Sequence, residues 1–143
     1  MAAHSLIETL HFDLGRVQLE LPEGTLPSLK ELISSREVAA AILSCPLPQG
    51  QSRPLEALKG FRLGGNKDTA LLHTLKGHSK LKRVELHTFT ELEDIRKLAE
   101  ASPKLTWLDV GRKGSAPSKA SGPASVVRLL SSIHFVHLLN MRV

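Results

Sequence analysis

Apolar residues recur along this chain in one short, repeated pattern. Four segments, which begin at Leu58, Leu81, Leu105 and Val136, carry apolar side chains at offsets 0, +3 and +5. Residues two positions apart lie on the same side of a β-strand, so each segment predicts a strand with one buried face. Because the pattern returns after roughly two dozen residues, it indicates an internal repeat.

A second apolar pattern precedes the later strands. Leu71, Ile95 and Val126 each lie ten residues before a strand segment, and Leu98 and Leu129 lie seven residues before the last two. Apolar residues three or four apart form one face of a helix. Each unit is therefore predicted to run helix, short turn, short strand.

Local signals indicate where the helices begin. Thr90 and Glu93 have the spacing of a capping box, in which each side chain satisfies a backbone N–H of the first turn. Ser35 is expected to cap an earlier helix, and Asp68 or Thr69 is expected to cap the helix between them.

These segments resemble a known repeat family. The run Leu58-x-x-Phe61-x-Leu63-x-x-Asn66 is similar to the leucine-rich-repeat consensus L-x-x-L-x-L-x-x-N, and the helical spacers resemble the ribonuclease-inhibitor-like branch. The amino-acid sequence of these segments is most similar to the repeats that follow F-boxes in ubiquitin-ligase adaptors, although no F-box is seen. The resemblance implies an α/β fold, a short right-handed solenoid with a parallel sheet on its concave face and helices on its convex face.

The repeats are predicted to occupy residues 29–143. Residues 1–28 contain an alternating stretch from Leu10 to Leu21 around Gly15-Arg16, which predicts a hairpin that caps the first repeat. Together the two regions form one domain. The stretch 111–122 is rich in Gly, Ser, Lys and Pro and predicts a long loop.

Composition narrows the class of protein. With 41% hydrophobic residues the chain is expected to fold, and its net charge of +5 favours acidic partners. Nucleic acid is a less favoured partner, because no aromatic residues are interleaved with the basic ones. A single cysteine, Cys45, and the lack of a recognisable signal or membrane span predict a cytoplasmic or nuclear protein.

No pattern in the chain points to catalysis, and no enzyme activity is expected. The seven histidines do not converge with other ligands at zinc-binding spacings, so neither a metal nor another cofactor is predicted. The glycines between Gly60 and Lys67 lack the Gly-Lys-Ser/Thr sequence of a phosphate-binding loop.

The strand pattern predicts which side chains are free to bind a partner. Positions +2, +4 and +6 of each strand alternate with the buried positions, so they face away from the core. The predicted partner-binding residues are Arg62, Arg83, Glu85, His87, Trp107, Asp109, Asn140 and Arg142. On this prediction the buried residues Leu63, Leu86 and Val110 lie side by side.

Trp107 has two possible roles. Tryptophan and arginine dominate interface hot spots, so Trp107 beside Arg83 has the character of an interface anchor. Alternatively, Trp107 shields the neighbouring strands while Arg83 stacks on it in a cation–π pair. Likewise, Arg62, Glu85 and Asp109 either bind a partner or pair with one another across the strands.

The sequence therefore favours a non-catalytic protein–protein interaction module or adaptor that binds through the concave sheet. Two alternatives stay open. The chain could be a structural subunit of a larger, possibly RNA-containing assembly. It could also form a homo-oligomer through the edge of its last strand, because the segment at Val136 is followed by no polar cap.

Overall fold

The fold is seen in a computed structural model that describes residues 5–12 and 18–113. Six strands form one parallel sheet, and five of them lie side by side in the order in which they occur along the chain. These strands are β1 (Thr9–Phe12), β2 (Glu31–Ser34), β3 (Ala57–Leu63), β4 (Arg83–Phe89), β5 (Trp107–Asp109) and the short β6 (Arg112–Lys113), which also pairs with β4.

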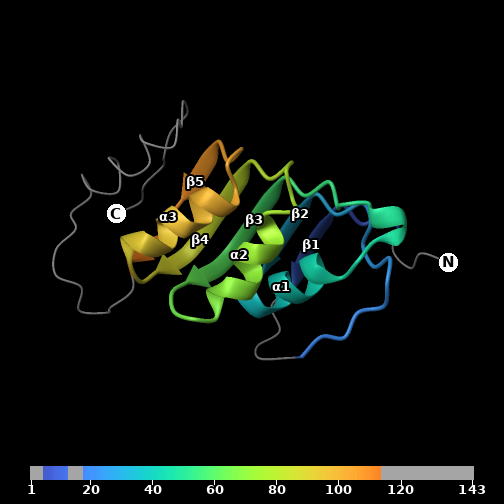
Figure 1. Cartoon of the computed structure of the whole chain (residues 1–143), viewed down its shortest axis with the longest axis horizontal. Coiled ribbons are helices and arrows are strands. Elements are labelled where there is room, and N and C mark those ends of the chain that lie inside the picture. The colour runs from blue at the N-terminus through green and yellow to red at the C-terminus, as the bar shows by residue number, and fades with distance from the viewer. Residues whose placement is uncertain (1–4, 13–17, 114–143) are drawn as a thin grey trace.

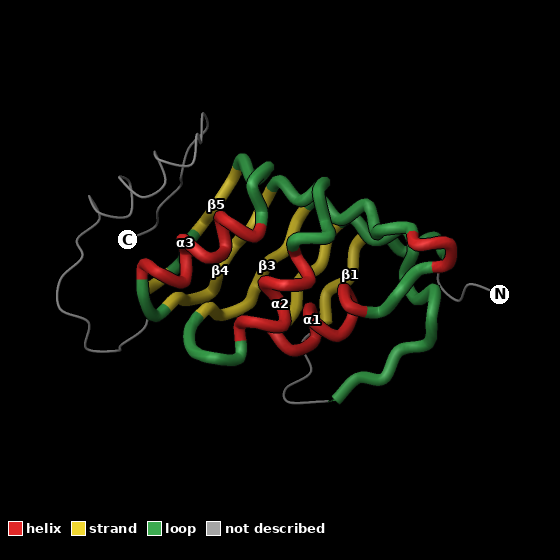
Figure 2. Tube along the Cα trace, viewed as in Figure 1, coloured by secondary structure: helices red, strands yellow, loops and turns green. Residues whose placement is uncertain are grey.

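Three α-helices connect the strands and lie side by side along one face of the sheet (Figures 1 and 2). They are α1 (Arg36–Ser44), α2 (Asp68–Leu75) and α3 (Leu92–Ala101), and a short 3₁₀ helix, η1 (Pro48–Gly50), follows α1. Parallel neighbours require such crossovers, because a tight turn can join only antiparallel strands. The predicted α/β class and parallel sheet are confirmed.

Rows of leucines hold the strands together. One residue from each strand occupies the same register position, and this row is Leu10, Leu32, Leu58, Val84 and Leu108. All but Leu10 are at most 2% exposed. The helices pack against this row through their own buried apolar faces, which include Ile42, Leu71 and Ile95. A fully buried aliphatic side chain contributes about 1.5–3 kcal/mol, so these rows supply much of the stability.

The predicted register of β3 is wrong by three residues. Leu58 pairs with Val84, so it is Leu55, fully buried, that corresponds to Leu81. A β-bulge around Gly60 then shifts the register of the strand, which puts Phe61 opposite Leu86. The predicted alignment of Leu63, Leu86 and Val110 is therefore wrong, since Leu63 pairs with Phe89.

The N-terminal region also differs from its prediction. Strand β1 pairs in parallel with β2 and extends the sheet by one strand. Among the described residues from 18 to 28 there is no second strand of a hairpin, although Leu19 and Leu21 pack against the core. In the described part of the alternating stretch, Thr9–Phe12 is a parallel strand and residues 18–21 form no strand.

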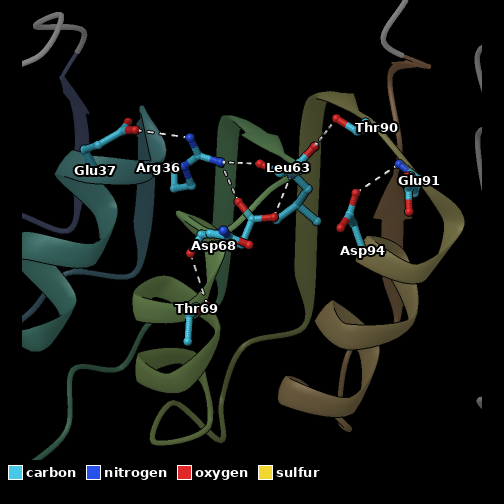
Figure 3. Close-up of polar contacts among 10 residues, drawn as sticks. Arg36, Glu37, Leu63, Asp68, Thr69, Thr90, Glu91 and Asp94 are labelled. Atoms are coloured by element: carbon cyan, nitrogen blue, oxygen red, sulfur yellow. Dashed lines mark hydrogen bonds and ion pairs between the residues drawn. The ribbon is translucent and has the colours of Figure 1, made fainter. Parts of the chain in front are cut away.

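Polar side chains at the beginnings of the helices close the turns that follow the strands (Figure 3). The Asp68 carboxylate accepts a hydrogen bond from the Gly64 backbone N–H at 2.6 Å and another from Arg36 Nη1 at 2.5 Å. In the next unit, the Asp94 carboxylate accepts from the Glu91 N–H at 2.9 Å.

Helix α1 begins as predicted, because the Ser35 hydroxyl accepts a hydrogen bond from the Val38 N–H at 3.4 Å. The predicted capping box of α3 is displaced by one residue, to Glu91 and Asp94. Thr90 instead donates its hydroxyl hydrogen bond to the Leu63 carbonyl at 3.4 Å, which ties two neighbouring units together (Figure 3).

Several predictions fall outside the described residues. They are the helix around Val126, the strand at Val136 with its open edge, and most of the loop at 111–122. In the part of the chain that is described, no helix has the length and apolar composition needed to cross a lipid bilayer.

Candidate partner-binding surface

The candidate surface is the sheet face opposite the three helices. Side chains alternate along a strand, so the residues on either side of the buried leucine row point to this face. They form two in-register rows, Thr9-Glu31-Ala57-Arg83-Trp107 and His11-Ile33-Lys59-Glu85-Asp109. We refer to these two rows together as the sheet-face rows.

Arg83 and Trp107 form the most distinctive pair in the sheet-face rows. They are register partners on β4 and β5, and the guanidinium carbon of Arg83 lies 5.0 Å from the centre of the Trp107 ring. The predicted cation–π pair is thus present. Arg83 also contacts Glu85, with Nη2 2.8 Å from Oε1. The role of Trp107 as an interface anchor stays a prediction.

Trp107 is partly exposed as a residue, and its buried indole N–H has no hydrogen-bond acceptor among the described residues. Arg83 is more open, with 47% of its side chain exposed. A partly buried aromatic ring beside an exposed guanidinium combines apolar area with charge, which is the chemistry typical of interface hot spots.

Lys59 was missed by the sequence prediction. Its ammonium lies 3.3 Å from Glu31 Oε2 and 3.9 Å from Glu85 Oε1, so it bridges two carboxylates on neighbouring strands. The prediction had given this position to Arg62, because it used the wrong register for β3. Leu55, three residues before Leu58, is the sequence signal that would have found Lys59.

The Asp109 side chain forms a hydrogen bond with the backbone. Its carboxylate accepts a hydrogen bond from the Gly111 N–H at 2.9 Å, which closes the turn after β5. Gly111 has φ of +61°, and a Cβ there would lie 2.4 Å from the Leu86 carbonyl oxygen, so this turn requires glycine. The alternative in which Arg62, Glu85 and Asp109 pair with one another across the strands is not seen among the described residues.

Arg62 and His87 lie apart from the Arg83–Trp107 pair. Both are exposed, and both line a pocket of about 540 Å³ at the carboxyl ends of the strands. His11 from β1 and the residues Ser35, Arg36 and Glu37 at the start of α1 line the same pocket. The predicted site therefore divides into two neighbouring regions. Asn140 and Arg142 lie outside the described residues.

The start of α1 sets the charge state of the pocket wall. A hydrogen bond from its own backbone N–H lowers the pKa of Glu37; burial opposes this, and the neighbouring Arg36 lowers the pKa further. Burial opposes the charged form of Arg36, yet the hydrogen bond and charge of Asp68 outweigh it and raise its pKa. Both side chains are therefore ionised at neutral pH.

Comparisons of the chain with protein-family models, with characterised proteins and with solved structures find no match. Within residues 5–12 and 18–113, no three His, Cys, Asp or Glu side chains are grouped as a metal ion would require.

Proposed function

We propose that this chain is a short leucine-rich-repeat solenoid that acts as a non-catalytic protein-interaction module. In this proposal the sheet-face rows form the concave surface and bind the partner. The repeated order of strand and helix, the consecutive parallel strands and the in-register leucine row support a repeat of this kind.

The observation that carries the proposed function is the Arg83–Trp107 pair on the helix-free face. The pair lies beside an ion-paired cluster in which Lys59 contacts both Glu31 and Glu85. Charges that are already paired leave little net attraction for a polyanion. They suit a protein surface of mixed charge around an aromatic anchor.

The test compares immobilised wild-type protein with Trp107→Ala, Trp107→Phe and a matched control, Lys97→Gln, on the exposed side of α3. Proteins captured from a native extract are then purified and their Kd values measured. We expect Trp107→Ala to weaken binding by about 2 kcal/mol, or roughly thirtyfold, while Lys97→Gln leaves it unchanged.

Circular dichroism of each variant shows whether its fold is intact. Unchanged binding by a folded Trp107→Ala protein would refute the proposed surface. A captured partner that is RNA, with an affinity that falls steeply with salt, would instead favour the assembly-subunit alternative.

A further inference from the structure

The pocket lined by Arg62 has the size and the charged side chains of a binding site for a specific kind of ligand. It has a volume of about 540 Å³ and lies on the sheet face at the carboxyl ends of β1 to β4, next to the start of α1. A volume of this size lies in the range of pockets that bind small molecules or peptide side chains, about 300–1,000 Å³. Its walls come from five elements, the strands β1 to β4 and helix α1, so several groups converge on one space.

The β-bulge in β3 forms this pocket. Gly60 has φ of +85°, and the register shifts on both sides of Phe61. The extra residue directs Phe61 into the core, where it is 1% exposed, and leaves Arg62 exposed at the pocket. A Cβ on Gly60 would lie 3.3 Å from Ile33 Cγ2, so a side chain there would narrow the pocket floor. Bulges commonly redirect a side chain toward a site in this way.

The pocket walls favour a negatively charged group. Arg62 forms no ion pair with any described residue, so its guanidinium is free to bind a ligand. The nine-residue helix α1 directs its amino end at the pocket, and the imidazoles of His11 and His87 add hydrogen-bonding groups. Arg36 contributes positive charge, although Asp68 neutralises part of it.

We propose that this pocket binds the carboxylate side chains of an acidic segment in a protein partner. A guanidinium fork binds carboxylate in a bidentate manner, and the partly exposed Ile33 offers apolar contact to the methylene groups of a glutamate. The pocket is larger than a single small anion needs and is continuous with the sheet-face rows. The inference rests on the proposed function in that it takes the ligand to be part of a protein.

Glu37 acts as an internal competitor for this ligand. Its carboxylate already accepts a backbone hydrogen bond at the start of α1, and it is the acidic side chain among the described residues that line the pocket. An incoming carboxylate is repelled by this charge. Removing the charge of Glu37 therefore strengthens binding, whereas removing that of Arg62 weakens it.

The experiment is an NMR titration of the ¹⁵N-labelled full chain with a hexaglutamate peptide at about 0.15 M ionic strength, where distant charges are screened. A hexaglutamine peptide controls for length, and inorganic phosphate is titrated separately. The protein variants are Arg62→Gln, Glu37→Gln and Lys97→Gln. Lys97→Gln is the matched control, because it also removes one positive charge but does so on helix α3, away from the pocket.

We expect hexaglutamate to shift the amide resonances of Ser35, Arg36 and Glu37. The Kd should rise about five- to tenfold in Arg62→Gln, fall about two- to fivefold in Glu37→Gln and stay within a factor of two in Lys97→Gln. Hexaglutamine should cause no shifts.

Equal weakening by Arg62→Gln and Lys97→Gln would mean general charge attraction and would overturn the proposal. Absence of hexaglutamate binding would also overturn it, whether or not phosphate binds. Because Trp107 is not varied here, a negative result leaves the partner-capture test of the proposed function standing, and the two failures can be told apart.

Discussion

The Asp68 carboxylate offers a quantitative test of how neighbouring units are joined. The Asp68 side chain is 5% exposed and that of Arg36 is 16% exposed. The carboxylate accepts one hydrogen bond from the Gly64 N–H at 2.6 Å and one from Arg36 Nη1 at 2.5 Å. Asp68→Ala therefore removes two hydrogen bonds at once. It also leaves a largely buried guanidinium without its main counter-charge (Figure 3).

The magnitude follows from these two losses. An unsatisfied buried N–H costs about 1–3 kcal/mol. Breaking one side of a buried ion pair costs about 3–5 kcal/mol, which partial exposure of Arg36 reduces. We expect Asp68→Ala to lower the free energy of unfolding by about 3 kcal/mol. Arg36→Met should cost about 1–2 kcal/mol, because Asp68 then keeps its bond to Gly64.

The assay is urea unfolding followed by circular dichroism at 222 nm for the wild type, both single variants and the double variant. Because each single variant leaves its partner unpaired, the double variant should lose at least about 1 kcal/mol less than the sum of the singles. A loss below about 1 kcal/mol in Asp68→Ala, or strict additivity, would refute the reasoning.

Three further predictions concern single positions. Gly64 has φ of +146°, and a Cβ there would lie 2.1 Å from Thr90 Oγ1. Gly64→Ala should therefore lower the free energy of unfolding by at least about 2 kcal/mol in the same urea assay. A neutral effect would contradict this turn geometry. Burial lowers the pKa of His78 from its ordinary value of 6.5, so as the pH falls the unfolded state binds this proton before the folded state does. The free energy of unfolding should therefore fall as the pH drops below 6.5. His78→Gln should lose less of its free energy of unfolding than the wild type between pH 7.5 and 5.5. Identical pH profiles of unfolding would contradict the burial of His78. Trp107→Phe should unfold within about 0.5 kcal/mol of wild type, because its indole N–H has no described acceptor and a phenylalanine ring still packs on Arg83; a loss above about 2 kcal/mol would show a core role for Trp107.

The sequence pattern predicts the strands correctly where one reading of the apolar spacing is possible. Leu81 and Leu105 begin their units as expected, and Val84 pairs with Leu108. In β3 the three-residue apolar step occurs twice, from Leu55 to Leu58 and from Leu58 to Phe61, and only the second start also has an apolar residue, Leu63, at +5. Only the bulge, which needs three-dimensional pairing to be recognised, decides between the two registers.

The candidate site was likewise predicted correctly where the strand register is regular and wrongly where it is not. Arg83, Glu85 and Trp107 lie together as predicted, because β4 and β5 have regular register. Lys59 was missed and Arg62 was misplaced, since both depend on the register of β3. The sequence signal for Arg62 at a pocket is the neighbouring Gly60, whose positive φ permits the bulge.

Trp107 is the single tryptophan of the chain, so it can report directly on the proposed surface. Protein labelled with 5-fluorotryptophan should give one ¹⁹F resonance, which can be followed while a partner recovered by the capture experiment is added. We expect this resonance to shift or broaden and to saturate at the measured Kd. A resonance that stays unchanged when the partner is fully bound would contradict a partner-binding role for the sheet face that carries Arg83 and Trp107.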